Sequence, residues 1–335
     1  MNLRKLALGL AVGITVVCFG AGNALAQRVV LGGNPPGSLF YSMAQAIGAT
    51  VTKHSPLKVD VLPQGGSTYY PMMSTGEVDF GLVNPIDAVA ATKARPPYDK
   101  VSRGRGFPMQ TLMLGSPIRL SLVTTKASGI TSVKQLRGRR VAANYGAFAS
   151  AGLTAVAVLA NHGMTLKDID VVTVSSYPEG VRAVMEGRAI AAVASIGSGI
   201  IRELDASRGA VILPIDPSPA AMARAQKIGE AYVIIKVPKG PPGVASQIFA
   251  LSYAITIVVR PDLDDQTAYK FIDALWNNYK DLKGIFRPLG SWTSNRFAST
   301  EAVMPYHPGA IKFYKEKGVW NSGLVSHQAK LLRAR

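Results

Sequence analysis

Cysteine is almost absent from this 335-residue sequence, which contains only Cys18. A disulfide framework needs at least two cysteines, so the chain must be stabilised by a buried core instead. Histidine is also scarce, and its positions, His54, His162, His307 and His327, are scattered without metal-ligand spacing. We therefore expect no metal site and no cofactor.

Motifs that position a phosphate or a nucleophile are missing as well. No Gly-Lys-Ser/Thr phosphate loop occurs, and Gly104-x-Gly106 lacks the third glycine and the preceding strand of a dinucleotide fingerprint. Gly197-Ser198-Gly199 lacks the spacer residues of a nucleophile elbow. We expect no catalytic residues and predict that the protein is not an enzyme. An exported serine hydrolase stays open as an alternative.

Acidic residues are few: the chain has 20 Asp and Glu against 37 Lys and Arg, a formal net charge of +17. An excess of this sign favours acidic solutes, nucleic acids or anionic membrane surfaces. The basic residues are dispersed, and the one RNA-like patch, Arg103-Gly104-Arg105-Gly106, lacks interleaved aromatics. We do not expect nucleic-acid binding, although an exported polyanion binder remains an alternative.

Long apolar runs are missing beyond the N-terminus, so we expect no membrane-spanning segment in the processed protein. At the N-terminus, Arg4 and Lys5 precede an apolar run over residues 6–21, and Ala24-Leu25-Ala26 fits a small-x-small cleavage site. These features predict a signal peptide over residues 1–26, cleavage after Ala26, and a periplasmic protein.

Short β-branched runs alternate with helical patterns over most of the chain, which predicts an α/β fold. We expect two lobes, each a mostly parallel sheet flanked by helices, with a ligand cleft between them. The expected division is 27–117 and 238–335 for lobe 1 and 118–237 for lobe 2. The segments 118–125 and 232–237 are expected to cross between the lobes, and the protein is expected to be a monomer.

Turn-forming loops recur where a predicted strand ends and a helix begins, the place where open parallel sheets bind ligands. Free N–H groups at helix starts suit an anion. The expected ligand-binding residues come from these loops and from the first crossing strand: Ser38, Phe40, Tyr41, Ser67, Asn84, Arg119, Tyr145, Ala147, Phe148, Ser150, Tyr177 and Gly197.

Structural roles remain open for several of these residues. Phe40 and Tyr41 could be the core-facing first turn of a helix, while Asn84 and Ser150 could act as helix caps. A cap can also bind a ligand. Arg119 could pair bidentately with a carboxylate or stabilise a lobe.

The order of these motifs resembles the TAXI family of TRAP-transporter solute receptors. The residues that carry the resemblance are Phe40-Tyr41, Gly65-Gly66-Ser67, Gly76-Glu77-Val78-Asp79, Leu82-Val83-Asn84-Pro85-Ile86-Asp87, Gly129-Ile130, Gln135-Leu136-Arg137-Gly138-Arg139-Arg140-Val141, and the run from His307 to Gly318. The resemblance implies the type II periplasmic-binding-protein fold. It also implies docking on TRAP membrane subunits, small and large or fused, that use an ion gradient.

Departures from the family fall in the ligand loops. Asn34-Pro35-Pro36 stands where members carry a Gly/Thr-rich loop, and Asn84 where they favour Gln. Tyr145 and Phe148 are added aromatics. We therefore expect a small organic anion, a carboxylate that is partly apolar or aromatic, captured by hinge closure. The alternatives in this fold are a receptor for an ABC importer or for a sensor kinase.

Overall fold

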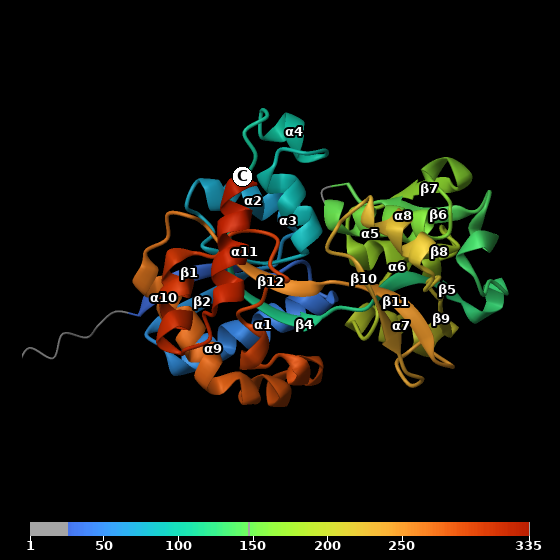
Figure 1. Cartoon of the computed structure of the whole chain (residues 1–335). Coiled ribbons are helices and arrows are strands. Elements are labelled where there is room, and N and C mark those ends of the chain that lie inside the picture. The colour runs from blue at the N-terminus through green and yellow to red at the C-terminus, as the bar shows by residue number, and fades with distance from the viewer. Residues whose placement is uncertain (1–25, 147, 335) are drawn as a thin grey trace, which may run out of the picture.

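The computed structural model describes residues 26–146 and 148–334, which form two α/β lobes lying side by side (Figure 1). Apart from Ala26, the predicted signal peptide lies outside the described residues. No helix in the described part of the chain is both long and apolar enough to cross a membrane.

The first lobe is built on a five-stranded sheet in the order β2-β1-β3-β12-β4. Its strands are β1 (Gln27–Gly32), β2 (Leu57–Leu62), β3 (Phe80–Val83), β4 (Gln110–Pro117) and β12 (Ala254–Val259). β1 pairs in parallel with β2 and β3, whereas β12 runs antiparallel between β3 and β4. The parallel strands end at the side of the sheet that faces the second lobe, which places their loops at the boundary.

The second lobe is built on a seven-stranded sheet in the order β10-β11-β5-β8-β6-β7, with β9 beside β5. Its strands are β5 (Leu120–Thr125), β6 (Arg140–Asn144), β7 (Asp170–Thr173), β8 (Ala191–Ser195), β9 (Ala210–Ile212), β10 (Val233–Val237) and β11 (Ile248–Ser252). Only β6 forms parallel pairs, with β7 and β8. β5 is antiparallel to each of its neighbours.

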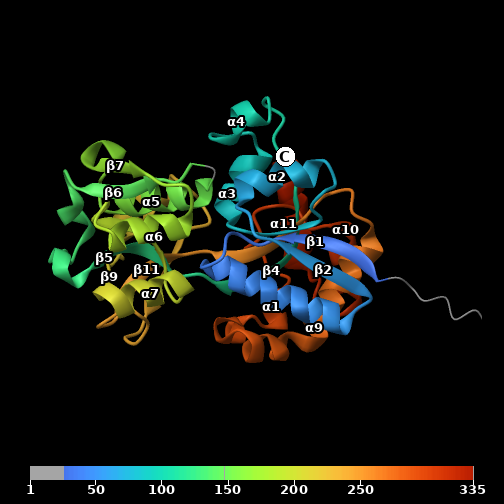
Figure 2. The ribbon, with the colours of Figure 1, turned by 180° about the vertical axis from the view of Figure 1, so that it is seen from behind.

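Helices cover both sheets (Figure 2). Those of the first lobe are α1 (Leu39–His54), α2 (Gly66–Ser74), α3 (Pro85–Thr92), α4 (Tyr98–Val101), α9 (Asp265–Ile285), α10 (Pro308–Glu316) and α11 (Ser322–Arg333). Those of the second are α5 (Ala149–Asn161), α6 (Tyr177–Met185), α7 (Gly199–Arg208) and α8 (Pro219–Gln226). Short 3-10 turns occupy Lys126–Ser128, Val133–Leu136, Leu166–Asp168, Arg287–Ser291 and Ser294–Arg296.

Helix α1 shows how the sequence produces these elements. The Ser38 side chain accepts a hydrogen bond from the Tyr41 N–H and caps the helix start. Met43, Ile47 and Val51 then recur at helical spacing and are buried. The predicted helix is therefore confirmed, and its start is fixed at the loop that follows β1.

The chain crosses between the lobes twice, after β4 and after β11. The crossings touch, because the Ile118 N–H donates to the Tyr253 carbonyl at 3.0 Å. The first crossing falls at residues 118–119, inside the segment 118–125 that was expected to cross, while β5 itself belongs to the second sheet. The second crossing differs from the prediction: residues 232–237 were expected to return to the first lobe, but β10 pairs antiparallel with β11 inside the second sheet. The Pro/Gly-rich segment 238–247 is a hairpin connection, and a strand pattern alone does not reveal which sheet receives the strand.

The predicted α/β fold with two helix-flanked sheets is confirmed. The sheets are mixed rather than mostly parallel, since the strands next to the crossings are antiparallel to their neighbours. The parallel strands of each sheet end at the boundary between the lobes. A strand that comes from the other lobe, such as β5 or β12, begins at this boundary, so it runs in the opposite direction.

Candidate functional site

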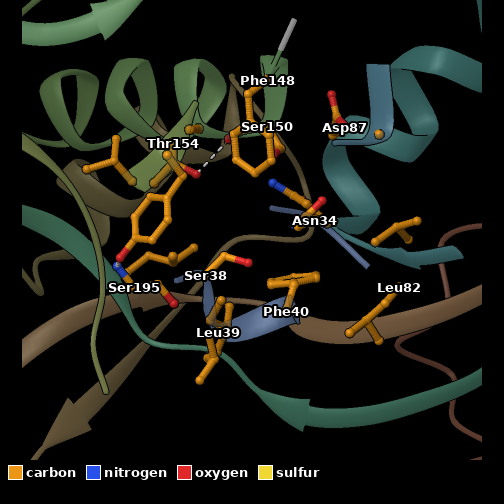
Figure 3. A pocket seen from close by; sticks show the side chains of 18 of the residues that line it. Asn34, Ser38, Leu39, Phe40, Leu82, Asp87, Phe148, Ser150, Thr154 and Ser195 are labelled. Atoms are coloured by element: carbon orange, nitrogen blue, oxygen red, sulfur yellow. Dashed lines mark hydrogen bonds between the residues drawn. The ribbon is translucent and has the colours of Figure 1, made fainter. Parts of the chain in front are cut away.

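A cavity lies between the two lobes and is lined from both (Figure 3). The residues that line it are Asn34, Ser38, Leu39, Phe40, Gly66, Tyr69, Tyr70, Leu82, Val83, Asn84, Asp87, Ile118, Leu120, Phe148, Ser150, Ala151, Thr154, Tyr177, Val193, Ser195 and Tyr253. They include the first turns of α1, α2, α3, α5 and α6. These helix starts bring partial positive charge and N–H donors to the cavity.

Two of the first-lobe polar residues are helix caps. Ser38 donates to the Pro35 carbonyl at 2.7 Å and accepts from the Tyr41 N–H at 3.0 Å. Asn84 accepts from the Ile86 N–H through Oδ1 at 2.9 Å, while its Nδ2 is buried and makes no hydrogen bond within 3.5 Å in the described structure. The Asn84 side chain still lies close enough to the Tyr232 hydroxyl of the second lobe to lower the pKa of Tyr232. Because an unpartnered buried donor is costly, this amide is available to an acceptor inside the cavity.

Asp87, in the first turn of α3, is 2% exposed. Its Oδ2 accepts from the Tyr70 hydroxyl at 3.0 Å, and its Oδ1 accepts from the Tyr98 hydroxyl at 2.7 Å. Burial raises the pKa of this carboxyl to about 6, although both tyrosine hydrogen bonds oppose the rise. Asp87 is therefore mostly ionised at neutral pH and mostly neutral below pH 6.

The described residues that line the cavity from the second lobe are all uncharged. Phe148, Ser150 and Thr154 come from the start of α5. The Tyr177 hydroxyl accepts from the Ser195 N–H at 2.9 Å and lies 2.8 Å from Ser198 Oγ. The Ser195 hydroxyl is buried without a hydrogen-bond partner among the described residues. Like the Asn84 amide, it is free to bind a polar group in the cavity.

Six of the residues expected from the sequence line this cavity: Ser38, Phe40, Asn84, Phe148, Ser150 and Tyr177. They come from four loops that are far apart in the chain. Their role in binding a ligand stays a prediction. Ser150 is not a cap, because α5 begins at Ala149 and its N-cap residue is Phe148.

Five other expected residues, Tyr41, Ser67, Arg119, Tyr145 and Gly197, do not line the cavity. Tyr145 is packed in the second lobe, 1% exposed, with its hydroxyl accepting from the Val193 N–H at 2.9 Å. Tyr41 and Gly197 are half-buried elsewhere, and Arg119 is exposed beside the crossing. Ala147 lies outside the described residues.

Ser67 contacts groups outside its own helix. The N-cap of α2 is Gly65, so the Ser67 hydroxyl does not cap this helix. It lies 3.1 Å from the Tyr98 hydroxyl and accepts from the Ala149 N–H of the second lobe at 3.4 Å. Ser67 therefore contacts the other lobe beside the cavity.

Sequence reasoning missed several lining residues, above all Asp87, Tyr69, Tyr70 and Tyr253. Asp87 lies in the first turn of α3, where an acidic residue is common and stabilising, so its position alone does not indicate a site. Tyr70 lies within α2, and Tyr253 lies between β11 and β12 at the second crossing. Neither belongs to a loop between a strand and the helix that follows it. Among the described residues, no group of three or more His, Cys, Asp and Glu side chains could hold a metal ion.

Solved structures share this architecture. One is the binding-protein component of an ABC phosphonate transporter from Pseudomonas aeruginosa, which is 12% identical with a TM-score of 0.51; the match covers 92% of this chain and 98% of that one. Another is a protein of Bordetella bronchiseptica RB50, 14% identical with a TM-score of 0.50, for which the coverage is 86% and 88%. At these identities the likeness shows the fold alone. Residues 31–318 match the NMT1-like family, and the chain belongs to that family.

Proposed function

We propose that this protein is a periplasmic solute-binding receptor that captures a small organic solute between its lobes and presents it to a membrane transporter. The observation that carries the proposal is the interlobe cavity, whose two walls each offer a buried polar group without a partner. These are the Asn84 amide and the Ser195 hydroxyl. A solute that binds both would satisfy them together.

Contacts between the lobes support capture by closure. The Ile200 N–H donates to the Gly37 carbonyl at 3.4 Å, and Ala149 donates to Ser67 beside the cavity. Gly229 packs so tightly on Ile86 that a Cβ at this position would lie 2.5 Å from Ile86 Cγ2. A solute that touches both walls favours the closed arrangement by its differential contacts.

A carboxylate on the solute is supported by the convergence of helix starts on the cavity. The first turns of α1, α3, α5 and α6 all contribute lining residues. Their N–H groups could hold a carboxylate without a cationic side chain. Arg119 is not needed for this role, and its exposed position beside the crossing favours a structural one.

TRAP membrane subunits are the proposed partner, on the strength of the motifs that resemble TAXI receptors. An ABC importer is the second candidate, favoured by the shared fold with a binding protein of an ABC phosphonate transporter. The genes beside this one would separate the two, because TRAP subunits and ABC permeases differ in sequence. The hydrolase alternative gains no support: among the described residues, Ser198 hydrogen-bonds to Tyr177 and to no histidine.

The experiment is a thermal-shift screen of the protein from Gln27 onward, after unfolding and refolding to remove carried-over ligand. The panel holds carboxylates, amino acids, amines and neutral polar solutes. A ligand that binds only the native state raises the melting temperature, and calorimetry then gives Kd. A selective shift that Asn84→Ala weakens supports the receptor. If no solute shifts the melting temperature, the proposal fails.

A further inference from the structure

The charge inside the cavity is opposite to the charge of the whole chain. The protein carries a formal net charge of +17, yet the described lining residues include no lysine, arginine or histidine. Asp87 is the only lining residue that is charged at neutral pH, and it makes no ion pair in the described structure. The cavity is therefore negative in its side-chain charge.

Among the described residues, no cationic side chain pairs with this charge, and only the two tyrosine hydroxyls and the start of α3 stabilise it. The titratable groups that sense it are tyrosines from α2, α4 and the segments beside β10 and β12, namely Tyr69, Tyr70, Tyr98, Tyr232 and Tyr253. Burial raises the pKa of each above its ordinary value, so all five are neutral. A buried carboxylate with only neutral donors keeps much of its desolvation cost, and that cost falls when a cation arrives.

The remaining walls suit a cation. Aromatic rings line the cavity from both lobes: Phe40, Tyr69, Tyr70, Phe148, Tyr177 and Tyr253. Figure 3 shows Phe40 and Phe148 on opposite sides of the Asn34 side chain. The rings of Tyr69 and Tyr70 contact each other edge to face, with 5.1 Å between their centroids, and the ring centroids of Tyr70 and Tyr98 are 5.7 Å apart. The faces of aromatic rings attract ammonium groups, most strongly when the site is shielded from water.

We propose that the solute carries a positively charged nitrogen, which binds in the aromatic part of this cavity with Asp87 as its counter-ion. The inference rests on the proposed receptor function and narrows its solute class to cations and zwitterions. The unpartnered Asn84 amide, with the helix starts, then binds the acceptor end of the solute. A carboxylate group suits this acceptor end of the solute. The carboxylate that the sequence predicts would then be the negative group of a zwitterion.

The test uses pairs of solutes that differ only in the replacement of nitrogen by carbon. The pairs are glycine betaine with 3,3-dimethylbutanoate, choline with 3,3-dimethyl-1-butanol, and 5-aminopentanoate with hexanoate. Calorimetry on the protein from Gln27 onward should give at least a tenfold lower Kd for the charged member of any pair that binds. Equal or tighter binding of the carbon members overturns the inference and leaves the receptor function standing. Binding of none of these solutes, while other panel members without a cationic nitrogen bind, overturns it as well.

A matched pair of variants places the cation. Asp87→Asn keeps the shape and an acceptor for one of the two tyrosine hydroxyls, and its NH2 group can donate to the oxygen of the other. Because it removes the charge, it should raise Kd for the charged solutes at least tenfold while leaving their carbon analogues within about twofold. Asp170→Asn removes one carboxylate from an exposed position at the start of β7 and should change neither. Equal effects of the two variants would contradict the role of Asp87.

If Asp87→Asn does not fold, the pH dependence of choline binding decides the matter. Choline does not titrate in this range, so any change reports on the protein. Burial sets the pKa of Asp87 to about 6, hence choline affinity should fall several-fold between pH 7.5 and pH 5 as the carboxyl is neutralised. Affinity that is constant over this range overturns the inference.

Discussion

The two walls of the cavity differ in chemistry although they are built alike. Each lobe places helix starts at the boundary, but the first lobe presents Asp87 and the Asn84 amide, whereas the second presents Ser195 and uncharged side chains. The first wall is therefore suited to binding a charged group of a solute. The second wall is suited to packing against the solute and binding one polar group. In the proposed receptor, closure matters because a solute would contact both walls only in the closed arrangement.

The largest effect is expected for a residue behind the second wall. Tyr145→Ala should lower the free energy of unfolding by about 3–5 kcal/mol, because it empties a packed site and leaves the Val193 N–H without its partner. Urea unfolding followed by circular dichroism measures the loss. Tyr41→Ala, on the half-buried first turn of α1, is the control and should cost much less. Similar losses would show that Tyr145 is not a core residue.

The ionised Asp87 carboxylate should lower the free energy of unfolding when no solute is bound. The folded-state pKa of Asp87, about 6, lies above the ordinary value of 3.8, so the folded state holds the proton more tightly and stability falls as pH rises from about 4 through 6. Removing the charge with Asp87→Asn should therefore stabilise the solute-free protein at pH 8 by about 2–3 kcal/mol, and much less at pH 4. Denaturant unfolding at both pH values tests this. A loss of stability at pH 8 would contradict it.

Two helix-cap variants can separate effects on stability from effects on solute binding. Asn84→Ala removes the cap of α3, and Ser176→Ala removes the cap of α6, where Ser176 accepts from the Glu179 N–H. Each should cost about 1 kcal/mol in the free energy of unfolding. Only Asn84 lines the cavity, so only Asn84→Ala should also raise Kd for the solute. A comparable rise in Kd for Ser176→Ala would mean that stability alone controls binding.

The smallest effect concerns the contact between the walls. Ser67→Ala removes an acceptor for the Ala149 N–H and a partner of Tyr98, and should shift the lobes toward the open arrangement by about 0.5–1 kcal/mol. Distance measurements between labels placed on the two lobes, without solute, should show a larger open fraction. Ser42→Ala, on the first-lobe helix α1 with only a weak 3.5 Å bond to the Ser38 carbonyl, should leave the distribution unchanged.

The first-lobe loops that reach the cavity could be predicted because their signals are local, although only Ser38, Phe40 and Asn84 of the residues lining it from this lobe were expected. A turn after a β-branched run, followed by Ser38 or by Asn84-Pro85, marks a strand end and a capped helix start. The second-lobe aromatics were harder. Tyr145 and Phe148 occupy the same loop, yet one points into the core and the other lines the cavity, and no pattern of spacing distinguishes them.

The sequence by itself determined the α/β class, the main βα units and the Asn84 cap, because hydrophobic periodicity and capping act within a few residues. Only the tertiary structure decided that β10 stays in the second sheet, since strand pairing depends on residues far away in the chain. Only the tertiary structure gave Asp87 its significance too. Its charge is common in a helix start, and it becomes exceptional when the fold buries it among tyrosines with no cation beside it.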